Sequence, residues 1–237
     1  MKSVFTYTKK RLHTLRRFLR EYEARPDLDI LHQIRVEIKK TKAVLNLIGY
    51  ARKKFDAHAV YIPFRTIHRA SGILWEPEVI NRLMKKYSFA EVPGNKNEME
   101  TFRQLIPDFQ HSLKKQKSVV LSAAKKVQLK VYKKYMKKKQ VGLRKLIRAG
   151  VRVGTVHPIR KQLKELHYLF TLTRPNRKID LIYTQCEKRI GQLLDQRLLI
   201  AQLRTQSANQ KIISPIQAHM KQELNKIRNE LRGFIKS

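Results

Sequence analysis

Residues 157–170 read HPIRKQLKELHYLF, and residues 32–45 read HQIRVEIKKTKAVL. The two stretches share His, Ile and Arg at their first, third and fourth positions and Lys at their eighth, 125 residues apart. A second match lies upstream of each stretch, LRRFLR at 15–20 and LRKLIR at 143–148, 128 residues apart. Two matches in the same order predict an internal duplication in which each half carries the same pair of helices.

Both stretches have the apolar spacing of an amphipathic helix. Basic residues follow these apolar positions by one, which is about 100° around a helix, so they form a stripe that borders the buried seam. Side chains that only cover the core edge could also lie there, but the recurrence of the offset in both halves favours a functional stripe. The stripe residues are His32, Arg35, Lys39 and Lys42 in the first half and His157, Arg160, Lys164 and His167 in the second.

The composition points to a polyanionic partner. The chain has 237 residues, with 53 Lys and Arg against 18 Asp and Glu, which gives a net charge of +35. Solubility does not need so large a charge, and a compact body carrying it repels itself unless a polyanion is bound. Nucleic acid, an acidic membrane surface and an inorganic polyanion are the candidates. A hydrophobic content of 42% argues against a disordered basic tail.

The sequence predicts a cytoplasmic protein. Cys186 is the single cysteine, so no intramolecular disulfide can form, and its apolar neighbours place it in the core. The first ten residues lack the apolar run of a secretory signal, and no stretch approaches the ~20 apolar residues of a membrane span. The high pI of about 10.6 leaves a nuclear or ribosomal location open.

Periodicity predicts an all-α fold of two related antiparallel four-helix bundles. Asp27 or Asp29 is expected to cap the first stripe helix, and residues 92–97 read as a loop. Proline positions guide several of the predicted boundaries. The expected helices cover residues 4–24, 28–49, 52–74 with a kink or break at Pro63, a short helix from Pro77, 98–148 interrupted near Pro107, 156 to before Pro175, 179–204, and a last helix from Ser214 and Pro215.

Enzyme signatures are thin. The chain has no Gly-rich phosphate loop, no His-Glu-x-x-His, no paired cysteines and no nucleophile elbow. His32 and His157 have Arg and Lys as helix neighbours and no nearby carboxylates, which disfavours a divalent cation. We therefore expect no catalytic residue, no metal and no cofactor. A cationic surface of this kind suits phosphate, because Arg offers a fork to its oxygens, Lys a point charge and His a donor.

These residues resemble the CHAD family, the conserved histidine α-helical domain. The family motif is a His with Arg at +3 and basic residues near +7, +8 and +10, once in each half. It is matched by His32, Arg35, Lys39, Lys40 and Lys42, and again by His157, Arg160, Lys164 and His167, with Glu165 departing at +8. Lys39 and Lys42 stand where Arg is commoner. A basic-x-x-Gly-x-x-x-acid element also recurs, at Arg69 and at Lys188, with glycines at 72 and 191.

The resemblance implies one CHAD-like domain over residues 1–237, with half-repeats of about 1–106 and 107–237 and pseudo-twofold symmetry. It implies non-catalytic binding of inorganic polyphosphate on a basic interior surface, and contact with polyphosphate granules and proteins of polyphosphate metabolism. Family members are often fused to a tunnel-type triphosphatase; here we expect a stand-alone binder. The expected ligand-binding residues are the stripe residues together with Lys40, Arg16, Arg20, Arg69 and Lys188.

A helical RNA- or DNA-binding protein is the alternative hypothesis. Charge does not separate the two, since both ligands bind with counterion release. Single-strand binders interleave aromatic residues with basic ones for stacking on bases. Here only Tyr132 and Tyr135 fall within a basic stretch, which favours a ligand without bases. A phosphatase or kinase is disfavoured, because the sequence shows no carboxylate cluster for Mg²⁺.

Overall fold

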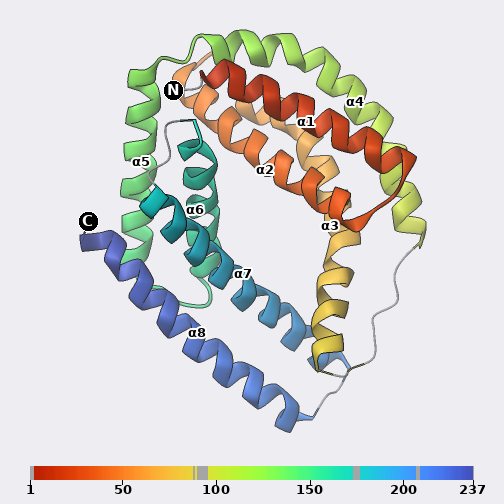
Figure 1. Ribbon diagram of the computed structural model, residues 1–237, viewed down its shortest axis with the longest axis vertical. Helices are drawn as coiled ribbons and strands as arrows, with labels where there is room; N and C mark the ends of the chain where they lie inside the picture. Colours follow the sequence, from red (N-terminus) through yellow and green to blue (C-terminus); the bar gives the residue numbers. More distant parts are fainter. Residues whose placement is uncertain (1–2, 88, 90–95, 173–176, 207–208, 237) are drawn as a thin grey trace. The chain divides into compact units, whose positions relative to one another are not determined.

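The computed structural model describes residues 3–87, 89, 96–172, 177–206 and 209–236, and it is all-α over these residues (Figure 1). The prediction of an all-α fold is therefore confirmed. The loop predicted at 92–97 lies mostly outside the described residues, and its last two residues begin a helix. The helices are α1 (Val4–Ala24), α2 (Leu28–Ala51), α3 (Ala57–Lys86), α4 (Lys96–Lys125), α5 (Leu129–Arg148), α6 (Val156–Phe170), α7 (Arg177–Thr205) and α8 (Gln210–Lys236).

Side chains cap the first two helices, close to the predicted positions. The Ser3 hydroxyl accepts a hydrogen bond from the Thr6 amide at 3.0 Å and so begins α1. The Asp27 carboxylate accepts one from the Ile30 amide, also at 3.0 Å, and begins α2. Each bond satisfies a backbone N–H that has no partner within its own helix. Of the two caps that the sequence offered for α2, Asp27 is the one used.

The helix boundaries predicted at Pro77, Pro107 and Pro215 are wrong, and no break occurs at Pro63. The α3 helix continues through Pro63 and Pro77, α4 through Pro107, and Pro215 lies inside α8. A proline within a helix costs about 3 kcal/mol, but each fully buried apolar side chain returns about 1.5–3 kcal/mol. In α4 the buried residues continue without a gap on both sides of Pro107, so burial outweighs the lost hydrogen bond. They are Phe102, Ile106, Phe109 and Leu113.

Other signals therefore end these helices. The chain leaves the helix at 126–128, between α4 and α5. At the start of α8, the Asn209 side chain accepts a hydrogen bond from the Lys211 amide at 2.9 Å.

The chain divides into two compact units. Unit 1 contains residues 1–78, 93–136 and 168–174, and unit 2 contains residues 79–92, 137–167 and 175–237. In unit 1, α1 packs on α2 and α4 around Leu15, Leu19 and Leu31 (Figure 1). In unit 2, α7 packs on α8 around a core that includes Leu193 and Ile227.

Two further expectations are met within the described helices. The thiol of Cys186 is buried, as predicted. None of the described helices has the length and apolar character needed to cross a membrane.

A buried carboxylate joins α1 to α2. Oε1 of Glu37 accepts hydrogen bonds from Nη1 of Arg11 at 2.9 Å and from Nζ of Lys40 at 2.8 Å. The Glu37 side chain is only 3% exposed and that of Arg11 12%. Removing one partner of a buried ion pair leaves the other charge buried without a counter-charge, which strongly destabilises the folded state.

We therefore expect Glu37→Gln to lower the free energy of unfolding by about 3 kcal/mol. Urea denaturation followed by circular dichroism measures this. The control is Glu21→Gln, which removes a carboxylate whose pair with Arg17 is largely exposed and should cost less than about 1 kcal/mol. Equal and small losses in the two variants would show that the Arg11–Glu37 contact does not hold α1 on α2.

Candidate functional site

The first stripe is held in place by Arg35, which is buried against α3. Its side chain leaves α2, and Nη1 donates to the backbone oxygen of His68 at 3.0 Å and to Oγ of Ser71 at 3.2 Å. A Cβ added to Gly72 would lie 3.0 Å from the same Nη1 atom, so the guanidinium rests on the glycine. Burial lowers the pKa of Arg35, and the charge of Glu76 opposes this shift.

The second stripe repeats this contact between α6 and α7. A Cβ added to Gly191 would lie 2.9 Å from Nη2 of Arg160. The same Nη2 atom is 4.0 Å from Oε1 of Glu187. The His-x-x-Arg motif and the basic-x-x-Gly element, which the sequence shows only as separate repeats, therefore meet in each half of the chain. Because glycine has no side chain, the planar guanidinium can lie directly on the helix.

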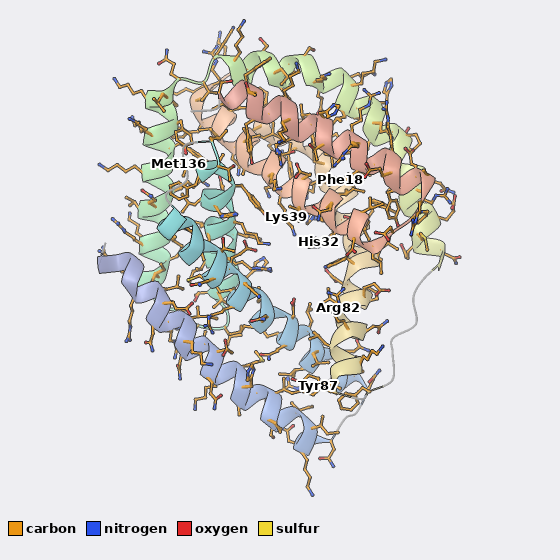
Figure 2. All side chains as sticks on the ribbon, in the orientation of Figure 1. Phe18, His32, Lys39, Arg82, Tyr87 and Met136 are labelled. Atoms are coloured by element: carbon orange, nitrogen blue, oxygen red, sulfur yellow. The ribbon has the colours of Figure 1, made fainter. Side chains whose placement is uncertain are left out.

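Aromatic side chains support His32 and Lys42 of the first stripe. The His32 ring lies 4.7 Å from the ring of Trp75, and Nζ of Lys42 lies 4.8 Å from the centre of the Tyr61 ring. A cation over an aromatic face is attracted by about 0.5–1 kcal/mol at an exposed position. Figure 2 shows His32 and Lys39 along α2. Sequence reasoning missed Trp75 and Tyr61, because nothing near them in the chain marks them as partners of α2.

Carboxylates partly neutralise the second stripe. Nζ of Lys164 donates to Oε1 of Glu187 at 2.8 Å. Burial lowers the pKa of Lys164 and the charge of Arg160 lowers it further, whereas Glu187 raises it. Burial raises the pKa of Asp195, against the opposing effect of Arg160 and Lys164. Glu187 lies four residues before Gly191, and His68 occupies the equivalent position four residues before Gly72. Because one position holds an acid and the other a histidine, the two stripes differ in net charge.

The departure from the motif at Glu165 is explained by a contact with α5. Oε2 of Glu165 accepts a hydrogen bond from Nζ of Lys139 at 2.8 Å, and the Glu165 side chain is 14% exposed. This ion pair joins α5 to α6, as the pair between Arg11 and Glu37 joins α1 to α2. In both halves a carboxylate of the stripe helix therefore binds a cation of the preceding helix.

The histidines of the second stripe differ in exposure. His157 is exposed at the start of α6, and His167 is half-buried near its end. Partial loss of hydration lowers the pKa of His157, and the positive charges of Lys161, Arg160 and Arg197 lower it further. An anion bound at this point would reverse the second effect.

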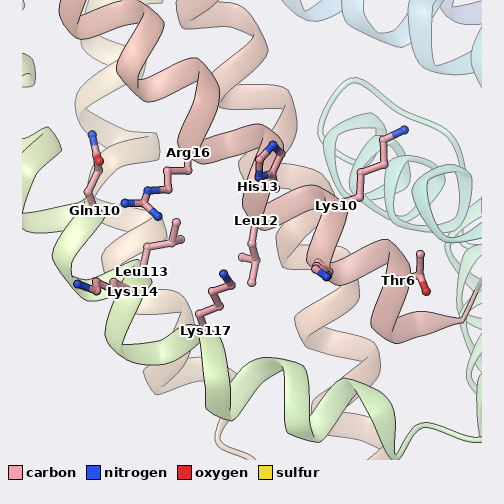
Figure 3. Close-up of a pocket in the computed structure, with 10 residues that line it drawn as sticks. Thr6, Lys10, Leu12, His13, Arg16, Gln110, Leu113, Lys114 and Lys117 are labelled. Atoms are coloured by element: carbon pink, nitrogen blue, oxygen red, sulfur yellow. The ribbon is translucent and has the colours of Figure 1, made fainter.

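The other predicted site residues lie outside these contacts. Arg69 and Lys188 are exposed, three residues before the glycines that receive the guanidinium groups. Arg20 is exposed on α1. Arg16 lies in a groove between α1 and α4, together with residues of α4 that the sequence analysis did not single out (Figure 3).

The described residues contain no group of three or more His, Cys, Asp and Glu side chains placed to hold a metal ion. No protein-family model, curated protein or solved structure matches the chain. The site is therefore characterised by its own geometry, a guanidinium resting on a glycine beside a basic helical stripe, which occurs twice.

Gly72→Ala should destabilise the protein by about 1–3 kcal/mol. Alanine raises helix propensity by about 1 kcal/mol over glycine, but its Cβ would displace a buried guanidinium whose hydrogen bonds are worth about 1.5–3 kcal/mol each. Gly233→Ala is the matched control, since a Cβ there meets nothing within 4 Å; it should stabilise by about 0.5–1 kcal/mol. Urea titrations of both variants measure the difference. If Gly72→Ala raised the free energy of unfolding as much as Gly233→Ala, Arg35 would move aside without loss of stability.

Proposed function

We propose that the protein binds inorganic polyphosphate along its two basic stripes and does not catalyse a reaction of it. The observation that carries the proposal is the repeated contact in which Arg35 rests on Gly72 and Arg160 on Gly191. A stripe of basic residues that only kept the surface soluble would not need its arginine to rest on a glycine of the neighbouring helix in both halves.

The chemistry of the stripes suits a linear chain of phosphates. His32 and Lys42 are ten residues apart on α2, which is roughly 15 Å along a helix. Arginine anchored on the neighbouring helix fixes the rotation of the stripe helix, so the His and Lys at helical spacing lie along one face. In the first stripe the residues best suited to contact phosphate are His32, Lys39 and Lys42. Arg35 is buried, and its role is to fix the position of these three residues. The carboxylates beside Arg160 and Lys164 predict weaker binding at the second stripe.

The placement of Tyr132 and Tyr135 supports polyphosphate over nucleic acid. Tyr132 and Tyr135, the two aromatic residues of the basic stretch, are 3% and 4% exposed. The Tyr132 hydroxyl donates to the backbone oxygen of Leu169, and the ring of Tyr135 packs on Tyr50. Rings held in the core are not available for stacking on bases. RNA or DNA binding therefore remains the second candidate, with net charge as its support.

The wider hypothesis is that the chain is a CHAD domain. Under it, the two halves arose by duplication as two four-helix bundles, and the protein works in the cytoplasm, at polyphosphate granules or beside enzymes of polyphosphate metabolism. Support comes from the motif residues and from the repeated contact of Arg35 and Arg160 with the glycines of the second element.

The test replaces two lysines of the first stripe, as Lys39→Gln with Lys42→Gln. Interactions of a charged group with phosphate are worth about 1.5–3 kcal/mol each, so we expect the Kd for long-chain polyphosphate to rise by about tenfold or more. Fluorescence anisotropy with labelled polyphosphate at about 0.15 M salt measures it, because exposed charges are screened there. The same samples are assayed for phosphate release from polyphosphate and from ATP with Mg²⁺, which should not occur.

The control removes equal charge from α5, as Lys133→Gln with Lys134→Gln, two exposed residues of unit 1. It should change the Kd little and act on the association rate at low salt. If both double variants lose affinity alike, the stripe is not a site. If single-stranded RNA displaces polyphosphate at equal phosphate concentration, the nucleic-acid alternative is favoured.

A further inference from the structure

A further cationic region lies between α1 and α4, within unit 1. It is a groove of about 450 Å³, which is within the usual range of small-molecule sites. Figure 3 shows side chains of both helices around it, with Arg16 and His13 on α1 and Lys114 and Lys117 on α4. The lining residues are Thr6, Lys9, Lys10, Leu12, His13, Arg16, Gln110, Leu113, Lys114 and Lys117.

Among the described residues, no ion pair compensates the charges of this groove. Five of its residues carry a permanent positive charge, and no carboxylate is among those that line it. The described part of the chain contains no ion pair to any of the five, which are Lys9, Lys10, Arg16, Lys114 and Lys117.

Four carboxylates of α1, α2 and α4 have other partners. Glu21 pairs with Arg17, Glu100 with Arg103, and Glu37 with Arg11 and Lys40. Glu23 accepts a hydrogen bond from the amide of Gln110 at 2.7 Å. Cations gathered around one groove repel each other, and a bound polyanion relieves that repulsion.

The floor of the groove is apolar. Leu12 and Leu113 close it from below and are only 4% and 6% exposed. An apolar floor excludes water from one side of the bound ligand, which strengthens the attraction between the ligand and the cations at the rim. The hydroxyl of Thr6 and the imidazole of His13 add further hydrogen-bond donors at the rim. The groove therefore suits a compact anion that spans α1 and α4.

We propose that the α1–α4 groove binds a compact small molecule that carries several phosphate groups. Phosphate is the matching chemistry, since Arg16 can offer two parallel donors to its oxygens and each lysine a mobile charge. The limited volume favours a small molecule over a long chain. This site is separate from the stripe on α2, with Arg16 as its one residue from the predicted set, and the inference does not depend on the proposed function.

The probes are inositol hexakisphosphate, a ring of phosphates, and inorganic tripolyphosphate, a short chain. Calorimetric titration at about 0.15 M salt gives their Kd values for the full chain. Arg16→Gln with Lys117→Gln removes one cation from each helix and should raise the Kd of the tighter probe by about tenfold or more. Both residues are exposed, and thermal unfolding checks that the variant keeps its fold. The tighter of the two probes tells whether the groove prefers a ring or a chain.

One matched variant separates this site from general charge. Lys133→Gln with Lys134→Gln removes the same charge elsewhere in unit 1 and should leave the Kd of the tighter probe within about twofold. The NMR signals of the His13 imidazole should shift on addition of that probe.

Equal losses in the groove variant and in the Lys133→Gln with Lys134→Gln control, the absence of a His13 shift, or equal binding of an oligoglutamate peptide would overturn the proposal. A stripe variant that still binds long-chain polyphosphate fully would contradict only the proposed function.

Discussion

A guanidinium lying on a glycine is the contact on which each basic stripe depends. Arg35 reaches α3 at Gly72, and Arg160 reaches α7 at Gly191, where an added Cβ would lie within 3.0 Å of the guanidinium nitrogen. Any larger residue at either glycine would displace the arginine. Because the arginine is three residues after the histidine of its stripe, anchoring it fixes the rotation of the stripe helix and hence the direction of the other basic side chains. The two repeated motifs therefore depend on each other. The glycine leaves room for the close approach, and the guanidinium of the arginine occupies that room.

Carboxylates are scarce in this chain, so each one changes the local balance of charge. With 18 acidic residues against 53 basic ones, the position of an acid decides which cations are compensated. Glu37 and Glu165 join the stripe helices to the helices that precede them, while Glu187 pairs with Lys164 of the second stripe. The groove between α1 and α4 has no acid among its lining residues. The two stripes and the groove therefore differ in how far nearby carboxylates neutralise their cations. The high net charge of the chain alone does not distinguish them.

Much of the local structure could be predicted from the sequence, because its causes are local. Apolar periodicity defines the all-α fold, Asp27 marks the start of α2, and the paired motifs indicate which residues matter. The helix breaks at Pro77 and Pro107 were predicted wrongly, because burial on both sides of a proline is a tertiary effect. Three features had no sequence signal: the burial of Arg35, the pairing of Lys164 with Glu187, and the groove between α1 and α4. Each depends on residues more than 20 positions apart, which only the packing of helices brings together.

The most direct test of the central claim is the pKa of His157, followed by NMR of its imidazole with and without polyphosphate. In the free protein, partial burial and the charges of Lys161, Arg160 and Arg197 hold this pKa below its ordinary value. Phosphate bound at the stripe supplies negative charge beside the ring and favours its protonated form. We expect saturating polyphosphate to raise the pKa of His157, with proton uptake and tighter binding as the pH falls. Saturation of the protein with polyphosphate without any change in the pKa of His157 would contradict it.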